Sequence, residues 1–331
     1  MRSLIVIFSL FFIYLISGCK ESESSKPSIQ GAKGEVLVVI DNEWRNGSEG
    51  ERVREVLFQP MLGLPQAESI FTPSFVPHQR FTGAMRTYRN IFFVRIGEDA
   101  QDDHVRYYRT TTWAKGQKMV VLEASDSDNF FELLNEHEDR ILGFFLAAER
   151  ERSLSVYKRN RNHKMINEIE SKFNVNMVVP DEFTRNQGSD NFSWMSKEAS
   201  RFSQGLMVYD FEYFGDYEDI TREFLLDKRD SALQRNVPGP SPGSYMATER
   251  TVETTFSRMT INEHQAFELR GLWKVEGDLM GGPFVLCAHF DEENSRIIMT
   301  DGYVYFPDEP KKRNLVWEVE SLFYSVEFSQ K

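Results

Sequence analysis

The sequence predicts an α+β protein with mixed or antiparallel sheets and long amphipathic helices. Three observations support this prediction. Glu35–Asp41 is a continuous β-branched run, typical of a buried strand. Apolar residues from Phe130 to Phe145 recur at spacings of three and four, as on the inner face of a helix. Between residues 252 and 306, strand-like segments alternate with polar turns, as in an antiparallel meander.

The first half of the chain alternates between short strands and helices. Strands are predicted at 35–41, 90–96, 118–123 and 176–179, and helices at 51–58, 102–112, from 128 onward, and around 165–173. Ser125 or Ser127 can cap the long helix that begins at Asp128, since a hydroxyl accepts from the free N–H groups of the first turn. The apolar pattern of this helix fades in the charged run 149–152.

The second half is richer in strand signals. Strands are predicted at 206–213, 252–261, 267–275, 283–290 and 296–306, and helices at 217–234 and 312–328. Residues 237–243 hold three prolines, which neither a helix nor a central strand tolerates, so they form a loop. Asp301-Gly302 is predicted to be either a tight hairpin turn or a bulge.

The two halves show one internal correspondence. His104 and Trp113 are nine residues apart, and so are His264 and Trp273, with an offset of 160 between the pairs. Residues 35–150 and 206–328 could therefore be two duplicated lobes with a ligand cleft between them, although coincidence also explains the spacing.

The beginning of the chain carries the strongest targeting signal. Arg2 precedes an apolar run from Leu4 to Ile16, which is typical of a signal peptide and shorter than the ~20 residues of a membrane-spanning helix. Leu15-Ile16-Ser17-Gly18-Cys19 resembles the lipobox of bacterial lipoproteins. The resemblance implies cleavage after Gly18, a diacylglyceryl group on the Cys19 thiol and acylation of the new N-terminus.

These signals predict four segments. Residues 1–18 are a lipoprotein signal peptide, 19–34 a flexible tether rich in polar residues, 35–173 an N-terminal α/β lobe with the long helix, and 174–331 a C-terminal α+β lobe. The chain of 331 residues is 40% hydrophobic and 13% aromatic, which is ample for a packed core.

Charge and cysteine content limit the function classes. A formal net charge of −12 disfavours nucleic acid and anionic headgroups as partners. Acylation of Cys19 leaves Cys287 as the remaining thiol, so no intramolecular disulfide is expected. The six histidines are scattered, and the sequence indicates neither a metal site nor a cofactor.

No catalytic signature is complete. Cys287 and His289 could form a nucleophile pair, but two positions along one strand suit a thiol–imidazole contact poorly. Ser155-Val156-Tyr157-Lys158 with Ser189-Asp190-Asn191 is similar to the motifs of penicillin-recognising enzymes, yet the chain lacks Lys-Thr-Gly. The glycines of segment 270–284 either cradle an anion or form a hairpin turn. Aromatic residues between 192 and 217 either pack the core or bind sugars.

Several segments together resemble one family. They include Gly63-Leu64-Pro65-Gln66, Phe192-Ser193-Trp194, Val237-Pro238-Gly239-Pro240, Arg270-Gly271-Leu272-Trp273 and Met280-Gly281-Gly282-Pro283-Phe284. The chain resembles a family of uncharacterised Bacteroidota lipoproteins, domain-of-unknown-function family 4837. This resemblance implies an envelope location. It says nothing about an activity, because the family has no assigned functional residues to carry over.

The function expected from the sequence is that of a lipid-anchored outer-membrane protein, on the periplasmic side or the cell surface, that binds a glycan or a partner protein of the envelope without catalysis. The alternative is a hydrolase acting on peptidoglycan or polysaccharide through carboxylates. The residues expected in a ligand cleft are Trp113, Trp194, Tyr245, Arg270, Trp273 and Asp278.

Overall fold

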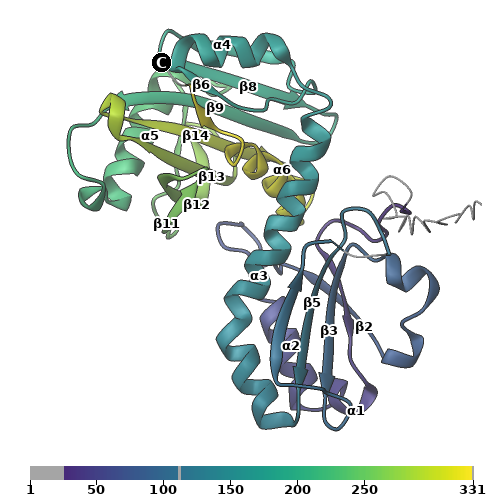
Figure 1. Ribbon diagram of the computed structural model, residues 1–331. Helices are drawn as coiled ribbons and strands as arrows, with labels where there is room; N and C mark the ends of the chain where they lie inside the picture. The colour runs from purple at the N-terminus through teal and green to yellow at the C-terminus, as the bar shows by residue number, and fades with distance from the viewer. Residues whose placement is uncertain (1–25, 111–112, 330–331) are drawn as a thin grey trace, which may run out of the picture.

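The computed structural model describes residues 26–110 and 113–329, which form two lobes connected by the long helix α3 (Figure 1). One lobe contains a mixed five-stranded sheet and the other an antiparallel eight-stranded sheet. The α+β class predicted from the sequence is confirmed.

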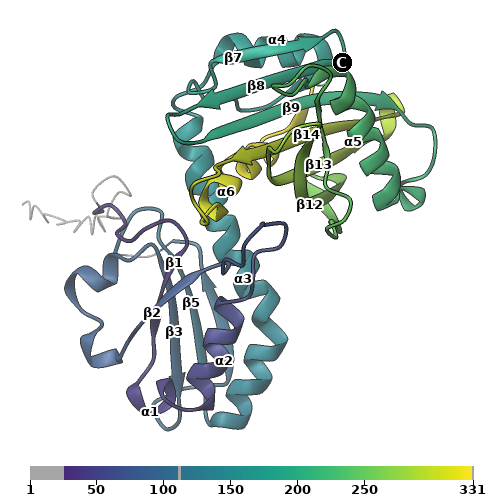
Figure 2. The same cartoon turned by 180° about the vertical axis from the view of Figure 1, so that it is seen from behind.

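The N-terminal lobe is built on a sheet with strand order β2-β1-β3-β5-β4, in which only β4 is antiparallel to its neighbour. Its elements are β1 (Glu35–Val39), α1 (Asn42–Arg45), α2 (Ser48–Leu57), β2 (Thr72–Val76), the 3₁₀ turns η2 (His78–Arg80) and η3 (Gly83–Thr87), β3 (Asn90–Ile96), β4 (His104–Tyr108) and β5 (Lys118–Ala124). Helices α2 and α3 lie on the same side of this sheet (Figures 1 and 2). A small apolar cluster that includes Phe81 and Trp113 covers the opposite face.

Helix α3 (Ser127–Tyr157) has 31 residues and is continuous through the charged run where the sequence pattern fades. It begins after Asp126, whose carboxylate accepts from the backbone N–H of Asn129 at 2.9 Å, so the cap is Asp126 rather than either predicted serine. Glu149 is buried on the sheet side and pairs with Arg89 and Arg152 at 2.6 and 3.0 Å. Glu149 can therefore lie on the buried face of the helix, because two arginines compensate its charge.

The C-terminal lobe is built on a sheet with strand order β10-β12-β13-β14-β9-β8-β7, and β11 also pairs with β12. Its elements are α4 (His163–Phe173), β6 (Val175–Asn176), β7 (Arg185–Ser189), β8 (Phe192–Glu198), β9 (Ser203–Glu212), η4 (Tyr217–Asp219), α5 (Arg222–Asn236), β10 (Tyr245–Thr248), β11 (Thr255–Ile261), β12 (His264–Glu276), β13 (Gly281–Asp291), η5 (Glu292–Asn294), β14 (Arg296–Tyr305), α6 (Arg313–Phe323) and β15 (Glu327–Phe328). Residues of α4 and α6 pack on one face of the sheet, and residues of α5 pack on the other.

The two lobes share one core at their junction. The ring of Phe71 lies 6.0 Å from that of Phe145 and 5.8 Å from that of Trp317. The carboxylate of Glu68 accepts from the backbone N–H groups of Lys312 and Arg313, each at 2.9 Å, at the start of α6. An N-terminal-lobe carboxylate therefore caps a C-terminal-lobe helix, where the free N–H groups favour negative charge.

Several local predictions are wrong. The helix expected over residues 312–328 ends at Phe323, and Glu327–Phe328 forms the strand β15, which pairs with β6. Residues 102–112 were expected to be helical, but His104–Tyr108 forms the edge strand β4. Asp301-Gly302 is neither a turn nor a bulge, because both residues lie in the middle of β14 with regular pairing on both sides. A Cβ on Gly302 would stand 2.2 Å from a side-chain carbon of Val319, so the glycine lets α6 approach the sheet.

The structure also bears on the predicted tether and on the predicted duplication. Residues from Pro27 onward pair with the N-terminal lobe: Gln30 N–H donates to Thr87 O at 2.9 Å, and Lys115 N–H donates to Pro27 O at 3.0 Å. The duplication is not confirmed, since one sheet is mostly parallel and the other antiparallel. His264 and Trp273 both lie on β12, whereas Trp113 lies outside the strand β4 that holds His104.

Candidate functional site

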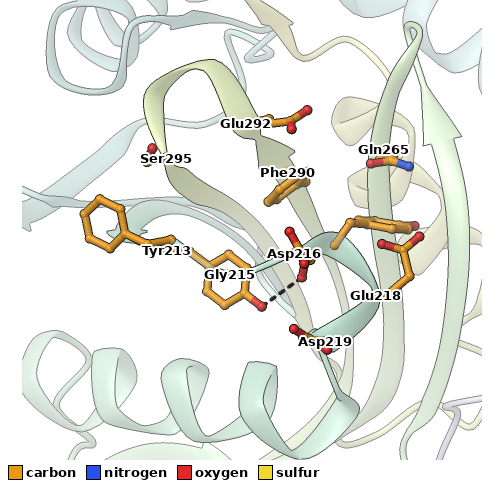
Figure 3. Close-up of a pocket in the computed structure, with 11 residues that line it drawn as sticks. Tyr213, Gly215, Asp216, Glu218, Asp219, Gln265, Phe290, Glu292 and Ser295 are labelled. Carbon is orange, nitrogen blue, oxygen red and sulfur yellow. Dashed lines mark hydrogen bonds between the residues drawn. The ribbon is translucent and has the colours of Figure 1, made fainter.

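A pocket of about 470 Å³ opens at one end of the C-terminal lobe (Figure 3). The connection from β9 to α5 forms one wall, and β12, the end of β13 and the η5 turn form the other. The lining residues are Tyr213, Phe214, Gly215, Asp216, Tyr217, Glu218, Asp219, Gln265, Phe290, Glu292 and Ser295.

Aromatic packing fixes the inner wall of this pocket. The ring of Tyr217 stacks on Phe267 with centroids 4.4 Å apart, and its hydroxyl donates to Ala266 O at 3.1 Å. Phe290 contacts both Tyr213 and Tyr217, at 6.2 and 5.8 Å between ring centroids. The ring of Phe214, at the rim, is 80% exposed. An exposed aromatic ring beside a fixed aromatic wall is a surface on which an apolar ligand face can stack.

Four carboxylates surround these rings: Asp216, Glu218, Asp219 and Glu292. In the view of Figure 3, Phe290 lies between Glu292 and Asp216. Within the described residues none of the four forms a salt bridge, and no lysine, arginine or histidine lines the pocket. Burial, Asp219 and Asp216 together raise the pKa of the Tyr213 hydroxyl, which donates to Asp216 O at 3.0 Å.

A second hollow continues the acidic surface. It shares Gln265, Phe290 and Glu292 with the first pocket and adds Glu263 and Glu293. Together the two hollows can accept hydrogen bonds from hydroxyl or ammonium groups while aromatic rings contact the rest of a ligand. The local aromatic density around residues 213–217 was visible in the sequence, but the carboxylates could not be ranked among 51 acidic residues.

Polar side chains also gather at the carboxyl ends of the parallel strands in the N-terminal lobe. Asp41, just after β1, accepts from the backbone N–H and Nδ1 of His78 at 3.1 and 2.8 Å. Burial raises the pKa of Asp41, but these hydrogen bonds outweigh it and lower the pKa. Arg95 of β3 pairs with Glu123 of β5, and His104 Nε2 lies 3.7 Å from that carboxylate. These contacts join the end of β1 to the turn after β2, and the ends of β3 and β5 to the start of β4.

The structure brings two of the predicted cleft residues together through Tyr303. Trp194 Nε1 donates to the Tyr303 hydroxyl at 3.1 Å, and the Tyr303 ring meets that of Trp273 edge-on at 5.4 Å. Trp273 is buried, and its Nε1 donates to Val304 O at 3.2 Å. These aromatic residues pack the sheet and do not line the pocket.

The other predicted residues lie elsewhere. Asp278, in the β12–β13 turn, accepts from Ser241 Oγ at 2.6 Å, and Tyr245 of β10 pairs with Glu276 of β12. The glycine-rich segment therefore forms a hairpin turn.

Arg270 and Trp113 lie apart from that turn and from each other. Arg270 is held between Glu268 and Glu320 of α6, at 2.7 and 2.9 Å. Trp113 packs against Phe81 in the N-terminal lobe. The six residues do not form one cleft, and Cys19 lies outside the described residues.

Cys287 and His289 are not poised for nucleophilic chemistry. The Cys287 sulfur lies 4.0 Å from His289 Nδ1, while His289 Nε2 contacts the Thr300 hydroxyl at 3.1 Å. Burial raises the pKa of Cys287 well above its usual value and lowers that of His289 to about 3. Both groups are therefore neutral near pH 7, and no thiolate is present to attack a substrate.

The described residues show neither a membrane-spanning helix nor a cluster of metal ligands. No helix among residues 26–110 and 113–329 combines the length and apolar character needed to cross a bilayer. The same residues contain no group of three or more histidine, cysteine, aspartate or glutamate side chains placed to hold a metal ion.

Comparison with solved structures gives only distant likenesses. The crystal structure of the Saccharomyces cerevisiae Ran-binding protein Mog1p matches with 8% identity and a TM-score of 0.32, covering 47% of this chain and 91% of that one. A point mutant of protein Mog1 matches with 7% identity and a TM-score of 0.33, covering 48% and 92%.

Comparison with sequences identifies the family. No curated protein matches the chain. Residues 30–158 match the domain of unknown function DUF8532, and residues 162–325 match the domain of unknown function DUF4837. The two matches are consecutive and span both lobes. The chain therefore belongs to the family described as "Domain of unknown function (DUF4837)", with a DUF8532 domain preceding it.

Proposed function

We propose that the protein is a lipoprotein, anchored at the outer membrane through Cys19, that binds an envelope glycan in the pocket of Figure 3. The sequence Leu15-Ile16-Ser17-Gly18-Cys19 supports the anchor. Two or more acyl chains hold a protein stably on a bilayer, whereas a single chain binds only marginally.

The observation that carries the binding proposal is the lining of the pocket. Sugars present hydroxyl groups along their edges and C–H groups on their faces, so they are recognised by carboxylate oxygens and aromatic rings together. The pocket supplies four carboxylates without salt bridges in the described part of the chain, beside the exposed ring of Phe214. A partner whose surface is basic would be attracted by the same charges and is the competing occupant.

Removal of the exposed ring tests the binding proposal. Soluble peptidoglycan fragments and envelope polysaccharide are titrated into the full-length protein in detergent, and binding is followed by calorimetry. Phe214→Ala should weaken glycan binding about tenfold or more, equal to ~1.4 kcal/mol, because a stacking surface is lost. Leu279→Ala is the matched control, since Leu279 is fully exposed on a turn outside the pocket. Equal binding by both variants, or no binding by the unmodified protein, would refute the glycan proposal.

A glycan hydrolase remains the second candidate, favoured by the same four carboxylates. Incubation of the protein with each glycan, followed by chromatography of the products, separates the two functions. A binding protein leaves the chain length of the glycan unchanged, whereas shortened fragments that disappear in Glu218→Gln or Asp219→Asn would establish hydrolysis.

A further inference from the structure

Two stretches of the N-terminal lobe are basic although the whole chain is acidic. The chain carries a net charge of −12, yet residues 69–97 and 104–122 contain no aspartate or glutamate. The two stretches hold eight basic residues: Arg80, Arg86, Arg89, Arg95, Arg106, Arg109, Lys115 and Lys118. Salt screens the interaction between exposed charges beyond about 10 Å. A local excess of positive charge can therefore attract anions even when the whole protein is acidic.

Most of this charge is not neutralised inside the fold. Arg89, Arg95 and Lys118 pair with Glu149, Glu123 and Glu151. The other five are exposed and have no acidic partner in the described part of the chain: Arg80, Arg86, Arg106, Arg109 and Lys115.

Three of these five belong to the segments that meet at one aromatic ring: Arg86 contacts the ring, and Arg80 and Lys115 lie close to it along the chain. The guanidinium of Arg86 lies 5.8 Å from the ring centroid of Trp113, and that ring packs edge-on against Phe81, the neighbour of Arg80, at 5.4 Å. Lys115 follows Trp113 by two positions, and Met85, beside Arg86, is 38% exposed. We call Arg80, Met85, Arg86, Trp113 and Lys115 the basic face. In Figure 1 the blue helical turns that follow β2, which contain its first three residues, lie on the side of the sheet away from α3.

The start of the folded chain lies directly beside this face. Lys115 N–H donates to Pro27 O at 3.0 Å, and Gln30 bonds with Thr87 and Arg89, both at 2.9 Å. Only six residues lie between Cys19 and Lys26, so this connection spans at most about 25 Å even when fully extended. An acyl anchor on Cys19 would hold the basic face, rather than the pocket of the other lobe, close to the bilayer.

We propose that the N-terminal lobe docks on the anionic phospholipid surface of the membrane that carries its anchor, through the basic face. This inference rests on the proposed lipid anchor. Arginine and lysine side chains bind the phosphate groups, while Trp113 and Met85 supply the amphipathic and apolar contacts that suit the headgroup region. Docking leaves the carboxylate-lined pocket of the C-terminal lobe free for its ligand.

The test places two labels on the lipidated full-length protein in vesicles. A fluorophore is attached to Ala84→Cys, in the basic face region, or to Leu279→Cys, on an exposed turn of the C-terminal lobe; the native Cys287 is buried and stays unlabelled. The vesicles carry a quencher on their headgroups. They consist of phosphatidylcholine alone, or of phosphatidylcholine in which about one lipid in three is the anionic phosphatidylglycerol. We expect several-fold stronger quenching at position 84 than at 279 on anionic vesicles, and loss of this difference on neutral vesicles.

Charge reversal identifies the contact. The triple variant Arg80→Glu, Arg86→Glu and Lys115→Glu should lower the quenching at position 84 on anionic vesicles to the level seen on neutral vesicles, because each basic residue contributes roughly fivefold to binding an anionic surface. The control triple Arg159→Glu, Lys164→Glu and Arg235→Glu changes the net charge equally at exposed positions outside the basic face and should leave quenching unchanged.

The outcomes separate the docking face from the lipid anchor. Co-flotation with vesicles without charge-dependent quenching at position 84 would overturn the docking face while leaving the anchor intact. Failure to co-float with either lipid composition would overturn the anchor and, with it, this inference.

Discussion

The buried pair Arg229–Asp301 should be one of the most sensitive positions in the fold. Arg229 of α5 has no exposed surface, and its Nε lies 2.7 Å from Asp301 Oδ2 in the middle of β14. Its Nη1 donates to the Thr248 hydroxyl at 2.8 Å, and its guanidinium lies 3.7 Å from the ring centroid of Phe284. One side chain thus connects α5 to three strands.

Arg229→Met removes these contacts and keeps the length and apolar stem of the side chain. Asp301 would keep only the hydroxyl of Tyr209, at 3.4 Å, as a hydrogen-bond donor. Breaking a buried pair by removing one partner costs about 3–5 kcal/mol, because the remaining charge is buried without compensation. We expect this loss in the free energy of unfolding, measured by urea denaturation at pH 7.

The stability of the Arg229→Met variant should depend on pH in a defined direction. Burial raises the pKa of Asp301, and Arg229 opposes this shift in the unmodified protein. Without Arg229 the pKa should rise further, so the folded variant holds a proton that the unfolded chain releases near pH 4. Its stability should therefore fall as pH rises above this value.

The double variant Arg229→Met with Asp301→Asn should recover much of the loss, because no charge is left in the core. A loss below about 1 kcal/mol for the single variant, or a loss independent of pH, would refute the reasoning.

Three further predictions address other parts of the molecule. In His78→Ala the pKa of Asp41 should rise toward 3.8, so the variant should lose less stability than the unmodified protein as pH falls from 6 to 3, as measured by denaturation at each pH. Gly302→Val should destabilise the protein by about 2 kcal/mol or more, because a Cβ there meets α6, whereas Gly143→Ala, with open space around it on α3, should stabilise it by up to ~1 kcal/mol. Cys287 should resist a thiol reagent in the native protein and react in denaturant; rapid native reaction would contradict its burial.

Strongly patterned elements could be predicted from the sequence because their signals are local. The strand Asn90–Ile96 has the predicted bounds, since it is a continuous apolar and β-branched run. The stripe from Phe130 to Phe145 identified α3 for the same reason. The edge strand His104–Tyr108 escaped notice because five residues after a pair of aspartates give too short a pattern to separate strand from helix.

Features that depend on distant partners could not be predicted. An Asp-Gly pair usually marks a turn, and only Arg229, 72 residues away, explains why Asp301 can lie inside a strand. The pocket combines segments around residues 213–219, 265 and 290–295, so its lining depends on the sheet topology. The net charge of −12 indicated repulsion from anionic surfaces. A net charge sums over the whole chain, so it does not show that basic residues gather on one face.

The most direct test of the account is the chemical state of the mature N-terminus. Mass spectrometry of the protein purified from membranes should find Cys19 as the first residue, carrying a diacylglyceryl group on its sulfur and an acyl chain on its amine. A free Cys19 thiol, or a mass that still includes residues 1–18, would contradict the membrane anchor on which the proposed function and the docking face depend.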